Sequence, residues 1–237
     1  MAIGELNQAL DELPRRLERL RKSGLKKLSR SDEDARFLRQ RGGFVLGYTG
    51  QIAVAAGSPR RGPQEVVFAS WGGGTGLRPW GRDDHLIVAQ RVTQNATDNE
   101  SLAPMIDEVR QRCGAPPAAA LADSGFFSVA NLEEMEQQKI DGYVPDWNPA
   151  CELNLGARCR RKARAAAHRR MRAKLRSPAG QAAYARRKAV VEPVFGVLKQ
   201  QRGMRQFRTR GLEKVSGEFT LPTLAYNITR RQALLAA

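Results

Sequence analysis

From Ser177 to Lys199 the chain reads Ser-Pro-Ala-Gly-Gln-Ala-Ala-Tyr184-Ala-Arg-Arg-Lys188-Ala-Val-Val-Glu192-Pro-Val-Phe195-Gly-Val-Leu-Lys199. A hydroxyl residue followed by proline predicts the start of a helix, because the hydroxyl oxygen caps a backbone N–H and proline has none to lose. On a helical period, one face carries Tyr184, Lys188, Glu192, Phe195 and Lys199. The intervening valines and Leu198 are expected in the core. A single acid among cations on such a helix suits either an ion pair or a catalytic carboxylate.

A second candidate acid follows a short apolar segment. The stretch Ala118-Ala-Ala-Leu-Ala-Asp123-Ser-Gly125-Phe-Phe-Ser128 predicts a strand, an acid at its carboxyl end, a glycine turn, and a helix capped by Ser128. Acids at this end of a strand lie where α/β sheets bind ligands. Two carboxylates from separate elements are the ligands that Mg²⁺ or Mn²⁺ needs for phosphodiester chemistry. Taken alone, an Asp at the end of a strand is more often a turn residue than a functional one.

These two segments, together with Gly42-Gly-Phe-Val-Leu-Gly-Tyr48, resemble the insertion-sequence transposases of the DDE type. The resemblance covers about residues 31–56 and 84–231. It implies an α/β fold, namely a mixed sheet flanked by helices and similar to ribonuclease H. It also implies DNA strand cleavage and strand transfer, with Asp123 and Glu192 as the second and third metal-binding acids for Mg²⁺ or Mn²⁺. By the same resemblance, the helix contributes phosphate or base contacts from Tyr184, Arg187, Lys188 and Lys199.

The first acid of the family has no clear match. In the family it lies on the first strand of the fold, ahead of the Gly-Gly-Phe strand. Asp11 here precedes a helix, and Asp32 and Asp34 lie in a polar segment with no strand before them. We therefore expect a sheet without that first strand, in a chain that resembles a transposase shortened at its N-terminus. Two functions stay open: an active transposase, or a non-catalytic DNA-binding remnant that acts as a regulator.

Charge is distributed unevenly along the 237 residues, whose formal net charge is +16. Residues 153–191 contain 13 Lys and Arg residues and no acid, whereas residues 1–152 contain 19 against 21 acids. A cationic block beside the candidate acids indicates a polyanionic partner, and we expect DNA at transposon ends and targets. An RNA-binding protein is the weaker alternative, because aromatic-rich RNA motifs are absent. Besides the helix residues, the expected DNA contacts are Arg160, Arg161, Arg169, Arg170, Arg172, Lys174, Arg176, Arg205 and Arg208.

The organisation expected along the chain is an N-terminal helical segment over residues 1–30 and a catalytic domain over residues 31–237. Phe44–Ala56 and Leu86–Gln94 predict an antiparallel pair of strands. Between them, residues 57–82 hold seven of the 22 glycines and predict an inserted loop or small flap. Residues 153–191 are read as a basic insertion leading into the helix that carries Glu192. After that acid, Pro193 predicts a kink or a fresh helical turn.

Local signals predict further details. Residues 31–39 are expected as a short polar helix or turn, and Lys214–Arg231 as a closing helix interrupted at Pro222. Asp98, just before a helix that starts near Glu100, is read first as its cap and only second as a metal contact. Cys151, Cys159 and His168 have the spacing of no standard zinc site and are not expected to bind metal.

The remaining expectations concern the setting of the protein. The sequence has no signal peptide and no apolar run long enough to span a membrane, which favours a soluble, intracellular protein without a membrane partner. The family resemblance implies a cytoplasmic, nucleoid-associated protein of a prokaryote. The family resemblance implies a homodimer or a higher synaptic oligomer.

Overall fold

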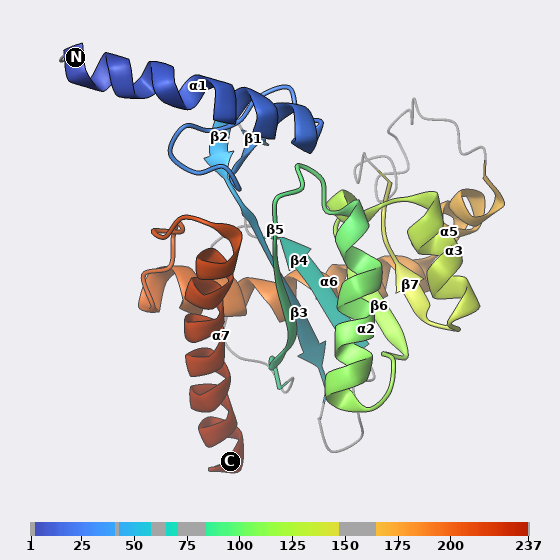
Figure 1. Ribbon diagram of the computed structural model, residues 1–237. Helices are drawn as coiled ribbons and strands as arrows, with labels where there is room; N and C mark the ends of the chain where they lie inside the picture. The colour runs from blue at the N-terminus through green and yellow to red at the C-terminus, as the bar shows by residue number, and fades with distance from the viewer. Residues whose placement is uncertain (1–2, 41–42, 58–64, 71–83, 147–164, 237) are drawn as a thin grey trace.

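The computed structural model describes residues 3–40, 43–57, 65–70, 84–146 and 165–236 (Figure 1). Within these residues, one mixed sheet has the strand order β5-β3-β4-β6-β7. Its members are β3 (Thr49–Ala56), β4 (Glu65–Ser70), β5 (Ile87–Thr93), β6 (Ala119–Ala122) and β7 (Asp141–Tyr143). The pairs β5–β3 and β3–β4 are antiparallel, whereas β4–β6 and β6–β7 are parallel. The predicted α/β class and the antiparallel pairing of β3 with β5 are confirmed.

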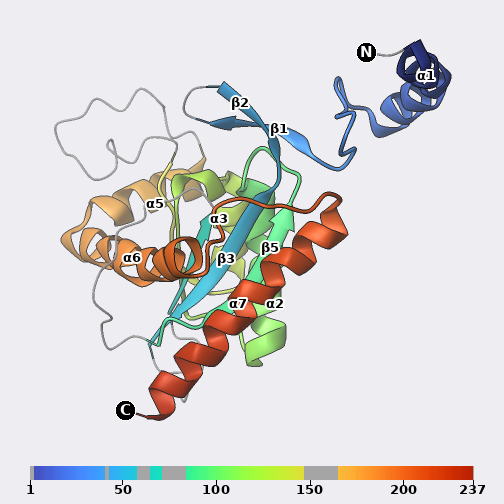
Figure 2. The same cartoon turned by 90° about the vertical axis from the view of Figure 1, so that its left-hand side faces the viewer.

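Helices cover both faces of the sheet (Figures 1 and 2). Helices α6 (Pro178–Gly196) and α7 (Leu212–Leu235) pack on one face, against strand residues such as Ile52 and Val54. On the opposite face, Ala53 and its neighbours contact α2 (Leu102–Cys113), α3 (Val129–Gln137) and α5 (Ala166–Arg176). Because successive strand residues point to opposite faces, the nearly continuous apolar sequence of β3 serves both layers at once.

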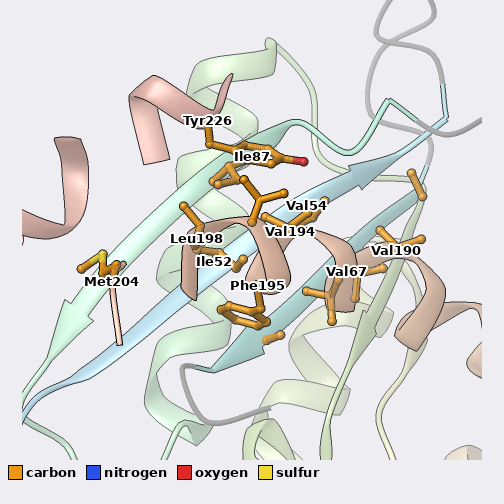
Figure 3. Close-up of a cluster of buried hydrophobic side chains, with 14 of the residues drawn as sticks. Ile52, Val54, Val67, Ile87, Val190, Val194, Phe195, Leu198, Met204 and Tyr226 are labelled. Atoms are coloured by element: carbon orange, nitrogen blue, oxygen red, sulfur yellow. The ribbon is translucent and has the colours of Figure 1, made fainter. Parts of the chain in front are cut away.

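Helix α6 begins and packs as its sequence predicts. The Ser177 hydroxyl accepts a hydrogen bond from the Gly180 N–H at 3.0 Å. Val190, Val194 and Phe195 enter the sheet-facing core, with Ile52 and Val67 opposite them (Figure 3). The helix includes Pro193 and then widens into a π-helical turn, η4 (Val197–Gln201). Wide turns of this kind occur often at functional sites.

Strand β4 occupies a position that the sequence did not indicate. Glu65–Ser70 lies within residues 57–82, for which a loop or flap was expected. It instead pairs with β3 on one side and with β6 on the other, and its residues Val66, Val67 and Phe68 are fully buried. The expectation of a loop is therefore wrong for these six residues. The rest of that segment, apart from Gly57, lies outside the described residues.

The N-terminal part contains α1 (Ile3–Ser23) and a hairpin of β1 (Arg36–Gln40) and β2 (Gly43–Gly47). Helix α1 lies beyond the hairpin, away from the central sheet (Figure 2). The helix was predicted, but the polar helix or turn over residues 31–39 was wrong where β1 forms. The expected break at Pro222 was also wrong, since α7 continues through it. None of the helices in the described segments is long and apolar enough to cross a membrane.

Candidate active site

Asp123 follows directly on β6, at the end of the sheet where β4 and β6 both finish. Its backbone is extended, and its side chain caps the short 3₁₀ helix η3 (Ser124–Phe126) by accepting a hydrogen bond from the Gly125 N–H at 2.9 Å. The strand, the acid, the turn and the Ser128 cap of α3 all lie where the sequence predicted them. The cap fixes the Asp123 carboxylate at the rim of the sheet.

A second carboxylate, that of Asp98, lies beside the first. A Cβ atom added to Gly125 would stand 2.8 Å from Asp98 Oδ2 and 3.0 Å from Asp123 Oδ1. Both oxygens therefore border the space that the missing side chain leaves open. We call Asp98 and Asp123 the acid pair. Asp98 was predicted mainly as a helix cap, but its side chain makes no capping hydrogen bond to η2 (Asn99–Ser101), the 3₁₀ turn that leads into α2.

Neighbouring charges and burial both shift the pKa of Asp123. Burial raises the pKa of Asp123, and the neighbouring Asp98 carboxylate raises it further. The Arg187 guanidinium and the Gly125 N–H act in the opposite direction, since both stabilise the ionised form. The half-buried Asp123 carboxylate thus lies between an anionic and a cationic neighbour. Any further positive charge nearby would stabilise the ionised form of Asp123.

Arg187 and Tyr184 approach the acid pair from α6. Tyr184 is buried, with burial as the main cause of its raised pKa, and its ring centroid lies 5.5 Å from the Arg187 guanidinium carbon. The negative charge of Asp123 also acts on the Tyr184 hydroxyl. The sequence assigned Tyr184 and Arg187 to the site. It did not indicate that Arg187 would face the acid itself.

Glu192 also lies on α6, half-buried between the core residues Val191 and Pro193. In the described part of the chain, no three His, Cys, Asp or Glu side chains gather closely enough to hold a metal ion. A cation shared by Asp123 and Glu192 therefore stays a prediction. The acid that the structure does bring to Asp123 is Asp98.

The acid pair has the chemistry that a divalent cation requires. Mg²⁺ and Mn²⁺ prefer hard carboxylate oxygens, and Asp98 and Asp123 present such oxygens to one small space beside Gly125. Gly125 matters here because a side chain would fill that space. The residues present thus fit such an ion.

The predicted basic residues of α5 are largely engaged within the molecule. Arg170 pairs with Glu136 of α3, Arg172 pairs with the buried Asp146, and Lys174 pairs with Asp141 of β7. Arg169 and Arg176 are exposed on the same helix. Arg160 and Arg161 lie outside the described residues, as do Cys151 and Cys159. A DNA contact through α5 stays a prediction, with Arg169 and Arg176 as its exposed members.

The other predicted cations divide into buried and exposed groups. Lys199 is 9% exposed, its ammonium lies 5.1 Å from the centre of the Phe195 ring, and burial lowers its pKa. Lys188 is exposed on α6, and Arg205 and Arg208 are exposed in the loop before α7. That loop and the β1–β2 hairpin border a cavity of about 440 Å³, to which Tyr48 and Arg208 contribute.

Comparison with known proteins places this geometry in a family. A family model described as a transposase DDE domain matches residues 81–228. The matched span is more than half of the chain, and it contains Asp98, Asp123 and Glu192. No curated protein and no solved structure matches the sequence. With its mixed sheet, its flanking helices and an acid at the carboxyl end of β6, this chain belongs to the DDE transposase family.

Proposed function

We propose that this protein cleaves DNA strands at transposon ends and joins them to target DNA, using divalent cations held by Asp123 and Glu192. The observation that supports this proposal best is the position of Asp123, a half-buried acid at the carboxyl end of a sheet strand, inside a match to the transposase DDE domain. When bound, the cations would activate the attacking water or 3′-hydroxyl and stabilise the leaving oxygen.

The residues of this chain have distinct parts in the proposed reaction. Asp123, fixed by its bond to the Gly125 N–H, positions its ligand oxygens without having to reorganise. Arg187 offsets the negative charge of the site and suits a contact with the scissile phosphate. The exposed Lys188 suits a neighbouring phosphate. The buried Tyr184 and Lys199 support the α6 side of the site from within.

DNA outside the site is proposed to bind the exposed cations of three segments, and two copies of the chain are proposed to hold the two ends. The cations are Arg169, Arg176, Lys188, Arg205 and Arg208. Each phosphate that these side chains neutralise would release counterions, so the affinity should fall steeply with salt.

A second function is a DNA-binding regulator without catalysis, which occupies transposon ends. It is favoured by the fact that no three metal-ligating side chains gather among the described residues. In that case Arg187 would serve as a permanent counter-charge for Asp123.

Cleavage of end-containing DNA with Mn²⁺ distinguishes the two functions. We expect nicking and strand transfer by the full chain, and loss of both in Asp123→Asn and Glu192→Gln. The matched control is Glu213→Gln, which removes an exposed acid from the first turn of α7. Salt-sensitive DNA binding without nicking at any Mn²⁺ concentration would favour the regulator.

A further inference from the structure

Asp98 has the position of a helix cap but does not act as one. It directly precedes η2, yet its side chain accepts no hydrogen bond from the first backbone N–H groups of that turn. Its Oδ1 instead accepts a hydrogen bond from Gln51 Nε2 at 2.6 Å, across the sheet from β3. Its Oδ2 lies 2.8 Å from the position that a Cβ atom on residue 125 would take. The carboxylate is therefore turned away from its own helix and toward Asp123.

Gln51 supplies an independent observation. Its side chain is completely buried, and the amide reaches into the site to hold Asp98. The other atom of that amide, Oε1, has no hydrogen-bond partner among the described residues. An unpaired buried carbonyl oxygen destabilises the fold, so it calls for another group that satisfies it. Amide oxygens are, like carboxylates, ordinary ligands of hard cations.

The neighbouring strand places another oxygen at the same level. Ser70, at the end of β4, is the partner of Gln51 in the strand register, and its hydroxyl also lacks a partner within the described residues. Gln51, near the start of β3, and Ser70, at the end of β4, thus place two polar side chains opposite each other in the sheet. If Asp98 did no more than accept the hydrogen bond from Gln51, the unpaired Gln51 Oε1 and Ser70 hydroxyl oxygens would have no explanation.

We propose that Asp98 is a metal ligand, which holds a divalent cation together with Asp123 in the space kept open by Gly125, with the Gln51 amide as its support. This inference rests on the proposed function and adds an acid to it. Asp98 then supplies the carboxylate for which the sequence offered no candidate on a strand. It does so from the turn before α2.

Two substitutions test this assignment on the full chain. Asp98→Asn keeps an oxygen that accepts the Gln51 hydrogen bond but removes the charge. Gly125→Ala adds one methyl group 2.8 Å from Asp98 Oδ2, and Gly125 has no left-handed backbone that would itself resist alanine. The matched control, Glu100→Gln, removes an acid from the same turn that instead accepts a bond from Asn95.

The measurement is Mn²⁺ binding without DNA, followed by the loss of the free-ion signal in electron paramagnetic resonance. We expect the Mn²⁺ dissociation constant to rise by about tenfold or more in Asp98→Asn and in Gly125→Ala, because each removes charge or space from the donor set. Glu100→Gln should bind as the unsubstituted chain does. A thermal melt of each variant without metal verifies that the fold is retained.

The possible outcomes distinguish the assignment of Asp98 as a metal ligand from the proposed function on which it rests. If Asp98→Asn binds Mn²⁺ as tightly as the unsubstituted chain while Asp123→Asn does not, Asp98 is no ligand, and the proposed function stands. If neither Asp98→Asn nor Asp123→Asn changes Mn²⁺ binding, the metal site at Asp123 is refuted as well. If Asp98→Asn does not fold, an unchanged dissociation constant in Gly125→Ala overturns the assignment by itself.

Discussion

Asp98 and Asp123 meet at Gly125, although a helix and a strand separate them along the chain: their Oδ2 and Oδ1 atoms stand 2.8 and 3.0 Å from the position of a Cβ there. Two carboxylates held close together repel each other, and their partial burial strengthens that repulsion because less water screens it. The arrangement is unfavourable for an empty fold and favourable for one that binds a cation.

Asp123→Asn is expected to stabilise the protein at neutral pH without divalent metal. Burial and Asp98 raise the pKa of Asp123, so the stability that this group gives is present in acid and is lost as the pH rises through that raised value. Asparagine keeps the acceptor for the Gly125 N–H without the charge. Thermal melts in chelator should show a higher Tm for the variant at pH 7.5, and the difference should shrink toward pH 4. A lower Tm at pH 7.5 would contradict this account.

Gly180→Ala is expected to destabilise the fold strongly. A Cβ at this position would lie 1.9 Å from the Lys174 carbonyl oxygen, because α5 ends against the first turn of α6. The backbone must then move, and we expect a loss of about 2–4 kcal/mol in the free energy of unfolding. The control is Gly217→Ala in α7, where no atom lies within 4 Å and alanine should add up to about 1 kcal/mol. Urea unfolding measures both, and equal effects would refute the close approach.

Asp146→Ala is expected to cost about 3–5 kcal/mol of stability. The Asp146 side chain is 1% exposed and accepts from Arg172 and, at 3.3 Å, from His168. Its removal leaves the largely buried guanidinium of Arg172, whose side chain is 12% exposed, without that anion. Asp141→Ala, which removes an exposed partner of Lys174, should change the stability by less than about 1 kcal/mol. Chemical unfolding of the two variants compares them directly, and a small effect of Asp146→Ala would show that Arg172 is satisfied elsewhere.

The double substitution Arg205→Ala and Arg208→Ala is expected to weaken DNA binding without loss of stability. Both side chains are exposed in the loop before α7. If each neutralises one phosphate, the slope of log affinity against log salt should become less negative by about 2. Fluorescence anisotropy over a salt series measures the slope. Arg112→Ala on α2, where the side chain pairs with Glu108, serves as the control, and an equal change there would point to net charge alone.

Local patterns predicted the elements whose signals lie close together in the sequence. The Ser177 cap, the turn after Asp123 and the apolar side of α6 all formed as expected, because each depends on residues within a few turns of one another. The surroundings of Lys199 were harder to predict from the sequence. Its helical phase placed it on the same face as Glu192, and the family resemblance implied a phosphate or base contact, but Lys199 is buried in the π-helical turn beside Phe195.

The elements that the sequence missed depend on distant partners. Strand β4 is short and flanked by glycine-rich sequence, and its identity comes from pairing with β3 and β6. Strand β1 begins just after a polar run and is defined by its pairing with β2. Asp98 looked like a cap because caps are recognised from adjacent residues, whereas its partner Gln51 lies on another strand. No local pattern contains that contact.

The sheet is continuous only through β4, which joins the antiparallel strands β5 and β3 to the parallel strands β6 and β7. Asp98 follows the antiparallel portion and Asp123 the parallel one, so the two acids sit across this seam. An incompletely folded chain, in which either portion has formed without the other, therefore cannot assemble them. The acid pair thus forms only once both portions of the sheet have joined through β4.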